Sequence, residues 1–326
     1  MTIIDKITER AKKSVKSVVL PESTDKRILK AAASLAKEQI VQPVLLGEPA
    51  ELEDAAKKAG VSLNGIEIVT IKEADYLSEA IDIFYERRKH KGITREDAEK
   101  EVTDPIMFAA SMVNMGYAHA CVAGAATATG KVVRSAILGI GMSEGINIIS
   151  STFLMITPDG KNYTFADCGV VPDPDSEQLA DIAISSAKTH LQLTEEEPKV
   201  AMLSFSTKGS ASHPRVEKVN QAVSIAQKKA PDLALDGELQ FDAAILPEIG
   251  SRKAPNSKIA GHANVLVFPD LDSGNIGYKI AQRIGGCTAL GPIIQGTKKP
   301  MHDLSRGCSA EDVELVAAIA SVQAQS

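Results

Sequence analysis

The segment from Asp303 to Val313, with the sequence DLSRGCSAEDV, holds the densest set of chemically active side chains in the chain. A hydroxyl, a guanidinium and a carboxylate follow one another here, at Ser305, Arg306 and Asp312. A carboxylate can act as a catalytic base only where it lies close to a transferable proton. This segment is therefore the strongest candidate for a catalytic site.

Asp312 also has a structural interpretation. Ser309 and Asp312 match the S-x-x-D capping box that begins a helix. A carboxylate that accepts a backbone N–H in such a box becomes a weaker base. The residues alone leave both roles of Asp312 open. The helix that would follow has an apolar face made of Val313, Val316, Ala317 and Ala320.

A second candidate is the loop GAATATG, from Gly124 to Gly130, between a predicted strand and a predicted helix. Small residues let backbone N–H groups approach an anion, and Thr129 and Gly130 would begin the helix, with Thr129 as its cap. Arg134 follows about one turn later, where it opposes the helix dipole, which indicates a partner anion. A tight turn with a solvated arginine explains the same residues.

Neither nucleotide-binding motif is complete. Five residues rather than four separate Gly124 from Gly130, and Val132 stands where a P-loop needs Ser or Thr to hold magnesium. Gly139, Gly141 and Gly145 are spaced G-x-G-x-x-x-G and follow a helical pattern, so a dinucleotide fingerprint is not supported.

Two further cationic segments allow two interpretations each. Arg88 lies in YERRKHKG at the end of a predicted helix, where a solvated face is the usual role. The stretch from Lys208 to Arg215 could hold a phosphate-rich group, or be a polar loop in which Ser212 or His213 caps the next helix.

The cysteines and histidines do not form a recognisable site. The four cysteines lie far apart without a C-x-x-C pair, which indicates reduced thiols in an intracellular protein. A buried thiol that acts as a small apolar group is the usual role for Cys168 and Cys308. No histidine belongs to an H-x-x-x-H or H-E-x-x-H pair, so we expect no metal site.

Composition limits the class of ligand. The 326 residues include 36 Lys and Arg against 42 Asp and Glu, a net charge of -6, which argues against a general binder of nucleic acid or anionic membranes. Any anion-binding site must therefore be formed by a local group of cationic side chains or backbone N–H groups. The sequence has no apolar run of about 18 residues and no signal-like N-terminus, so we expect a cytoplasmic protein without a membrane span.

Short apolar runs alternate with helical patterns, which predicts βαβ units and parallel sheets. A chain of this length usually forms two domains. After Gly145 the pattern changes to two strands, Ile146–Ile156 and Tyr163–Val171, joined by a Pro158-Asp159-Gly160 hairpin turn. We therefore expect an α/β protein with a domain boundary near residue 144.

Longer stretches resemble a known family. PDLDSGNIGYKIAQRIGG (Pro269–Gly286) and GPIIQGTKKPMHDLSRGCSAEDV (Gly291–Val313) closely resemble the phosphate acetyl/butyryltransferase family. YERRKHKGIT, GAATATGKVVRSA, FADCGV and DGELQFDAA match the same family in the same order. The likeness spans nearly the whole chain.

The resemblance implies two α/β domains with a central cleft, in a fold related to isocitrate and isopropylmalate dehydrogenases. The last segment of such chains returns to the first domain. We therefore expect residues 1–143 plus 292–326 as domain I and residues 144–291 as domain II. The family usually forms homodimers.

The resemblance also implies an activity, the reversible transfer of an acetyl group between coenzyme A and phosphate. By similarity, Asp312 takes the proton from the CoA thiol and Ser305 positions the sulfur or stabilises the tetrahedral intermediate. Arg88, Arg134 and Arg306 correspond to arginines that bind the phosphoryl group or anionic parts of CoA. CoA, acetyl phosphate and phosphate are then substrates, with no permanently bound cofactor and no nucleic-acid partner.

Three alternatives accompany this interpretation. Phosphate butyryltransferase activity would use the same arginines and base on a longer acyl group. A non-catalytic acyl-CoA-sensing module is disfavoured because Ser305, Arg306 and Asp312 are all present. A decarboxylating NAD dehydrogenase of the related fold is disfavoured because its acidic metal cluster is not visible in the sequence.

Overall fold

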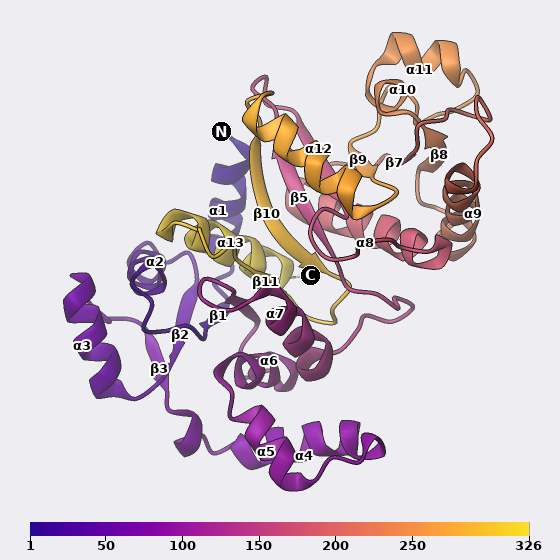
Figure 1. Cartoon of the computed structure of the whole chain (residues 1–326). Helices are drawn as coiled ribbons and strands as arrows, with labels where there is room; N and C mark the ends of the chain where they lie inside the picture. The colour runs from indigo at the N-terminus through magenta and orange to yellow at the C-terminus, as the bar shows by residue number, and fades with distance from the viewer. Residues whose placement is uncertain (326) are drawn as a thin grey trace. The chain divides into compact units, whose positions relative to one another are not determined.

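The computed structural model describes residues 1–325, which form two compact α/β units. The first unit contains Met1–Ser143 and the chain from Thr297 onward, and the second contains Glu144–Gly296. Figure 1 shows the chain coloured from indigo at the N-terminus to yellow at the C-terminus. Within the first unit, the yellow segment lies among indigo elements.

The first unit is built on a five-stranded sheet in the order β11-β4-β1-β2-β3, in which every neighbouring pair is parallel. After β1 the chain adds β2 and β3 on one side, and β4 then pairs on the other side. The order of strands therefore reverses between β1 and β4. The strands are β1 (Ser17–Leu20), β2 (Gln42–Leu46), β3 (Glu67–Val69), β4 (Ala120–Ala123) and β11 (Met301–Asp303).

The helices of the first unit agree with the predicted alternation. Those before β4 are α1 (Ile3–Lys13), α2 (Lys26–Lys37), α3 (Pro49–Ala59), α4 (Leu77–Arg88), α5 (Arg95–Val102) and α6 (Pro105–Met115), with short turns at Ile71–Glu73 and Lys89–Lys91. After β4 come α7 (Thr129–Ser135), a π-helical stretch Ala136–Ile140, and α13 (Ala310–Gln323).

Helix α13 belongs to the core of the first unit. It packs against α1, α2 and β4 (Figure 1). The predicted apolar face is confirmed, because its four residues are all buried. Burying a valine side chain contributes about 1.5 to 3 kcal/mol, so this face stabilises the packing of the last helix in the first unit. The residues are Val313, Val316, Ala317 and Ala320.

The second unit has a six-stranded mixed sheet in the order β10-β5-β6-β9-β7-β8. β5 pairs antiparallel with β10 and β6, and the remaining pairs are parallel. The predicted hairpin is confirmed between β5 and β6. The strands are β5 (Ser150–Ile156), β6 (Asn162–Ala166), β7 (Val200–Leu203), β8 (Leu235–Leu239), β9 (Val265–Val267) and β10 (Thr288–Gln295).

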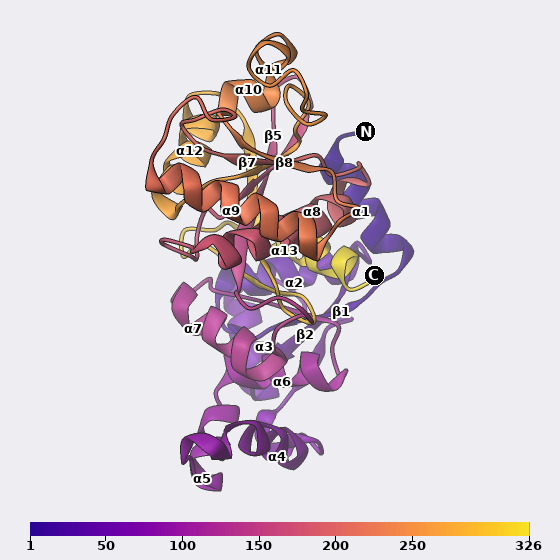
Figure 2. The same cartoon turned by 90° about the vertical axis from the view of Figure 1, so that its right-hand side faces the viewer.

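Helices cover both faces of the second sheet, as Figures 1 and 2 show. Alternate residues along the strands point to opposite faces and fill two separate apolar clusters. α8 (Ser176–Thr194) and α9 (Pro214–Lys229) complete one cluster. The other lies under α10 (Phe241–Ile245), α11 (Pro247–Lys253) and α12 (Leu271–Arg283).

Predicted boundaries differ from the structure at three places. The strand predicted from Ile146 begins at Ser150. The strand predicted over Tyr163–Val171 ends at Ala166, because the Asp167 carboxylate accepts the N–H groups of residues 169–171 and turns the chain. The predicted return to the first domain at residue 292 falls inside β10. That strand pairs with β5 as far as Gln295, so the second unit extends to Gly296.

Within residues 1–325, no helix has both the length and the apolar character needed to cross a membrane. The same residues contain no cluster of His, Cys, Asp or Glu that could hold a metal ion.

Candidate active site

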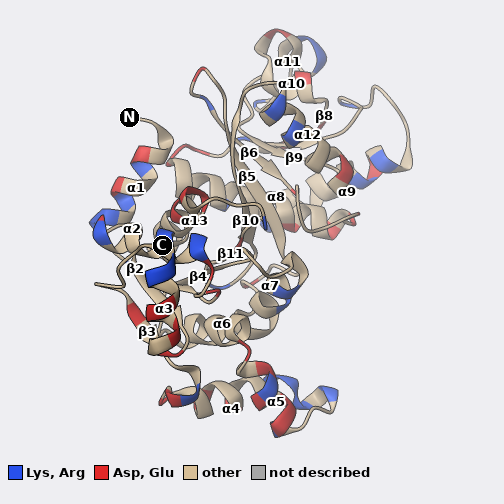
Figure 3. Cartoon of the chain, turned by 60° about the vertical axis from the view of Figure 1, so that its left-hand side comes forward, with Lys and Arg blue, Asp and Glu red and all other residues tan. Residues whose placement is uncertain are grey.

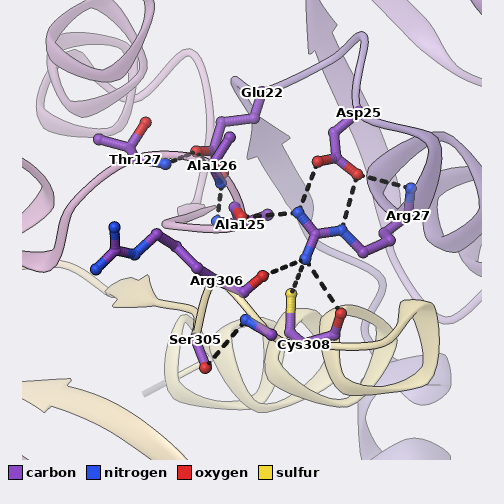
Figure 4. A network of polar contacts seen from close by, with 10 residues as sticks. Glu22, Asp25, Arg27, Ala125, Ala126, Thr127, Ser305, Arg306 and Cys308 are labelled. Atoms are coloured by element: carbon purple, nitrogen blue, oxygen red, sulfur yellow. Dashed lines mark hydrogen bonds and ion pairs between the residues drawn. The ribbon is translucent and has the colours of Figure 1, made fainter.

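The candidate site lies at the carboxyl edge of the first unit's sheet, where β1, β4 and β11 end as neighbours. In open α/β sheets, ligands bind outside the carboxyl ends of the strands where the strand order reverses. Here that point lies between β1 and β4. The loops that follow these three strands form the network of polar contacts in Figure 4.

The loop after β11 carries Ser305 and Arg306, both exposed. The Ser305 hydroxyl accepts a hydrogen bond from the Gly307 N–H at 3.2 Å. The Arg306 guanidinium extends away from the network in Figure 4 and makes no ion pair or hydrogen bond within residues 1–325. It is therefore available to bind an anion.

Asp312 forms the capping box that the sequence allowed. Its Oδ2 accepts the Ser309 N–H at 2.9 Å, and its own N–H donates to the Ser309 hydroxyl at 3.1 Å. Oδ1 accepts no hydrogen bond within the described chain, and the residue is exposed. The capping role uses one carboxylate oxygen and leaves the other accessible to a substrate.

The loop after β4 binds an anion, but the anion belongs to the protein. The N–H groups of Ala125, Ala126 and Thr127 donate to the Glu22 carboxylate at 2.7, 2.8 and 2.6 Å (Figure 4). The sequence correctly indicated an anion-binding backbone. The sequence did not identify the anion, which is the Glu22 carboxylate from the loop after β1.

The sequence predicted that Thr129 caps α7, but the N-cap residue is Ala128, which makes no side-chain hydrogen bond to the helix. The Thr129 hydroxyl instead donates to Asp303 Oδ2 at 2.6 Å and so joins α7 to the end of β11. Gly130 is exposed, and a Cβ there would meet no atom within 4 Å. The start of α7 thus has open space beside it.

Asp303 is an ionisable side chain in an apolar position. It is 1% exposed, and burial raises its pKa to about 6, with the Glu22 charge acting in the same direction. Its Oδ1 has no hydrogen-bond partner. Gly124 makes this approach possible, because its φ is +107° and a Cβ at that position would lie 2.3 Å from Asp303 Oδ1.

Arg134 already has a partner within the first unit. Its guanidinium binds the Glu101 carboxylate through two hydrogen bonds of 2.7 and 3.1 Å, joining α7 to α5. It lies in the last turn of α7, where it favours the helix dipole, so the predicted opposition to the dipole was wrong.

Arg88 ends α4 and makes no ion pair or hydrogen bond in the described chain. Its neighbour Arg87 instead donates to the Gly139 carbonyl and to Asn114. No contact joins Arg88 or Arg134 to Ser305. The structure thus places Ser305 and Arg306 on the loop after β11 and Asp312 in the first turn of α13, which follows that loop, while the other two arginines belong to separate elements.

Sequence reasoning missed several residues at this edge, among them Glu22, Arg27 and Asp303. The first two lie in PESTDKR, the polar turn that follows the first strand. Such a turn at the carboxyl end of a parallel strand is a signal for a site. Its partners, however, are the loops after β4 and β11, and only the order of strands in the sheet identifies them.

The start of the loop from Lys208 to Arg215 is held by groups of β8. Glu238, which is 2% exposed, accepts hydrogen bonds from the Gly209 N–H and the Ser206 hydroxyl. Lys208 binds Asp236 and the Gly237 carbonyl. His213 caps α9 by accepting the Arg215 N–H, as one of the two interpretations predicted. These contacts favour the polar-loop interpretation.

The thiols at Cys168 and Cys308 are both buried, and burial raises the pKa of each above its ordinary value. Neither has the accessible, low-pKa environment of an activated nucleophile. Figure 3 shows acidic and basic residues interspersed along α1 and α5 rather than gathered by sign.

Comparison with known proteins identifies relatives along the full chain. A family model described as phosphate acetyl/butaryl transferase matches residues 2–321. The phosphate acetyltransferase of Acetivibrio thermocellus is 47% identical over 330 residues, covering 100% of this chain and 99% of that protein. That of Thermoanaerobacterium thermosaccharolyticum is 48% identical over 330 residues, covering 100% of each.

Solved structures agree with these relatives. A phosphotransacetylase from Streptococcus pyogenes matches with a TM-score of 0.94 and 44% identity, over 99% of this chain and 98% of that chain. A structure described as a 4-hydroxythreonine-4-phosphate dehydrogenase from Salmonella typhimurium matches with a TM-score of 0.59 and 10% identity, over 95% of this chain and 99% of that one. The second match concerns the fold alone, and it confirms the predicted dehydrogenase-like α/β fold.

Proposed function

Because the chain belongs to the phosphate acetyl/butaryl transferase family, we propose that it catalyses the reversible reaction of acetyl-CoA with phosphate to give acetyl phosphate and CoA. The match over residues 2–321 carries this conclusion. The loop after β11 supports it, because an unpaired guanidinium, a hydroxyl and an accessible carboxylate oxygen lie on one short segment at the carboxyl edge of the sheet.

Asp312 is the proposed base. A thiol with a pKa of about 8.5 is only a few per cent ionised at neutral pH, so a base beside the CoA sulfur raises the fraction of thiolate. The free Oδ1 of Asp312 can accept that proton while Oδ2 keeps the capping hydrogen bond. The capping bond also fixes the direction of the carboxylate, which a catalytic base requires.

The thiolate then attacks the carbonyl carbon of acetyl phosphate. A carbon–sulfur bond forms, the bond between the acyl carbon and the phosphate oxygen breaks, and phosphate leaves with the electron pair. Ser305 is the proposed donor of a hydrogen bond to the sulfur or to the developing oxyanion. No acyl-enzyme is required, in keeping with the burial and raised pKa of the Cys168 and Cys308 thiols.

The arginines supply the anion-binding charge. Arg306, beside Ser305, is the proposed ligand of the phosphoryl group, which a guanidinium can bind through two hydrogen bonds. Arg88 is unpaired and can bind an anionic part of CoA. Arg134 can do so only by sharing or exchanging its contact with Glu101. Thr129 and Gly130 border the same edge, and we propose that they contact substrate.

One coupled assay tests the function directly. The purified protein should form acetyl-CoA from acetyl phosphate and CoA, and butyryl phosphate should give a lower kcat/KM, since the relatives at 47 and 48% identity are acetyltransferases. One added methylene is worth only about 1 to 3 kcal/mol, so the preference is about 10- to 200-fold. A preference for butyryl phosphate would favour phosphate butyryltransferase activity.

Direct transfer and the base have separate tests. Rapid quenching with labelled acetyl phosphate should recover no acetylated protein, and stoichiometric acetyl-Cys308 would contradict direct transfer. For the base, Asp312→Asn is compared with Ser309→Ala, since the first replaces the charged acceptor of the capping box by a neutral one and the second removes the Ser309 hydroxyl that accepts the Asp312 N–H. Both should lose about 1 kcal/mol of stability, but only Asp312→Asn should lower kcat strongly. Equal activities would assign Asp312 to capping alone.

We also propose that the protein works in the cytoplasm as a homodimer. The four cysteines are unpaired, as in a reducing compartment. Ile276 and Ile280 on α12 and its C-cap residue Ile284 are spaced four residues apart and are 57, 52 and 83% exposed, which supports a protein partner on this face. Light scattering after size exclusion measures the mass, and Ile280→Glu should shift it toward the monomer if α12 forms the contact.

A further inference from the structure

Arg27 links the three loops of the candidate site. It lies at the start of α2, after β1, and each of its five N–H groups has an acceptor. Nε and Nη2 donate to the Asp25 carboxylate at 3.0 and 2.7 Å. Nη2 also donates to the Ala125 carbonyl at 2.7 Å. Nη1 donates to the carbonyls of Arg306 and Cys308 at 2.7 and 3.2 Å (Figure 4).

The loop after β11 depends on this cation because it has few contacts of its own. Within the turn, Ser305 receives the Gly307 N–H on its hydroxyl and the Cys308 N–H on its carbonyl. The carbonyls of Arg306 and Cys308 both point at Arg27, and a single guanidinium can hold two such oxygens because its N–H groups are fixed in a planar fork.

Asp25 fixes the position of that guanidinium. It is the N-cap of α2, where it accepts the Arg27 N–H at 2.8 Å, and it also binds the Arg27 side chain. The side-chain hydrogen bond from Arg27 is the largest cause that lowers the pKa of Asp25, so the pair stays ionised at neutral pH. Arg27 thus connects a rigid helix start to the loops after β4 and β11, and it has no donor left for a substrate.

We propose that Arg27 is a positioning residue for acetyl transfer: it holds the backbone of Arg306 and Cys308 so that Ser305 and the Arg306 guanidinium keep their places at the carboxyl edge. This role rests on the proposed function for its kinetic consequence. The structural consequence, a turn that opens when Arg27 is removed, is independent of any activity.

The kinetic test uses Arg27→Gln and Arg27→Lys. Gln cannot reach the loops after β4 and β11 together, and Lys restores the charge without the planar fork. Both variants should lower kcat. Arg27→Gln should lower it about 100-fold, because a misplacement of catalytic groups by about 1 Å costs a factor of that size. Arg27→Lys should restore no more than a small part of the lost kcat. KM for CoA should change less than kcat, because Arg27 does not contact substrate.

Lys299→Met is the matched control. Lys299 also binds two backbone carbonyls of the first unit, those of Val113 and Asn114, at 2.8 and 3.3 Å, but away from these loops. The Lys299→Met variant should have a lower Tm, but its kcat should stay within about twofold of the wild-type value when activity is measured well below the Tm of each protein. If Lys299→Met loses as much kcat as Arg27→Gln, general destabilisation explains both and the positioning role is wrong.

Cys308 reports on the turn directly. It is 7% exposed, and its Sγ lies 3.6 Å from Arg27 Nη1, whereas Cys287 in the second unit is partly exposed. Alkylation with iodoacetamide, followed by peptide mass spectrometry, should be at least about tenfold faster at Cys308 in Arg27→Gln, with Cys287 as the internal standard unchanged.

The two readouts separate the proposals. If the wild type makes no acetyl-CoA but Cys308 becomes reactive in Arg27→Gln, the proposed function fails and the positioning of the turn stands. If kcat falls while Cys308 stays protected, Arg27 acts on substrate and positioning is refuted. Unchanged kcat and unchanged Cys308 reactivity also refute it.

Discussion

The buried carboxyl of Asp303 gives the sharpest quantitative prediction. It lies at the end of β11, is 1% exposed, and has a pKa of about 6 in the folded protein against an ordinary value of 3.8. The main cause is burial, because the charged form loses its contact with water. The Thr129 hydrogen bond acts in the opposite direction but does not offset it.

The sign and size follow from linkage. Because the folded state binds the proton more tightly than the unfolded chain, the protonated carboxyl favours folding at low pH, and that contribution is lost as the pH rises through about 6. A pKa difference of about 2 units corresponds to about 3 kcal/mol over the whole titration. Between pH 5 and pH 8 the expected loss is about 1.4 kcal/mol.

Asp303→Asn removes this titration and keeps an oxygen that can accept the Thr129 hydroxyl. Urea unfolding of both proteins, followed by circular dichroism at pH 5 and pH 8, gives the difference in unfolding free energy at each pH. Titrating groups that do not interact with Asp303 contribute equally to both proteins and cancel. The wild type should lose about 1.4 kcal/mol more than the variant between the two values. Parallel pH profiles would refute the assignment of a raised pKa to Asp303.

Three further outcomes are expected from substitutions in the first unit. Glu22→Ala leaves three N–H groups without their carboxylate, so the unfolding free energy should fall by about 2 to 4 kcal/mol in thermal or urea denaturation, with Glu22→Gln in between. Gly124→Ala should be poorly folded, with a large drop in Tm, because its Cβ would lie 2.3 Å from Asp303 Oδ1 at a φ of +107°. Glu101→Gln breaks a half-exposed pair and should cost less than about 1 kcal/mol, but by releasing Arg134 it should lower the KM for an anionic substrate in the coupled assay. Each prediction can be contradicted. A Glu22→Ala protein as stable as wild type would show that Glu22 does not stabilise the loop after β4. A normal Tm for Gly124→Ala would contradict the close approach to Asp303, and an unchanged KM for Glu101→Gln would contradict a substrate-binding role of Arg134.

Local patterns in the sequence were sufficient for the elements and for part of the site. The alternation of apolar runs and helical patterns predicts the α/β class, since each pattern reports which face of a strand or helix is buried. The capping box at Ser309 and Asp312 and the apolar face of α13 involve residues within one helix, and both are present in the structure. The anion-binding backbone of the Gly124–Gly130 loop was likewise evident from its small residues.

Contacts between distant segments were decided by the tertiary structure. Glu22 fills the loop after β4, and Arg27 holds the backbone of Arg306 across 279 positions of the sequence. Both contacts exist because parallel strands β1, β4 and β11 are neighbours whose carboxyl ends share one edge. The sequence by itself determined which groups could do chemistry and which short segments carry them. The order of strands decided which anion each loop receives and which arginines remain free, because a hydrogen bond depends on distance in space and not along the chain.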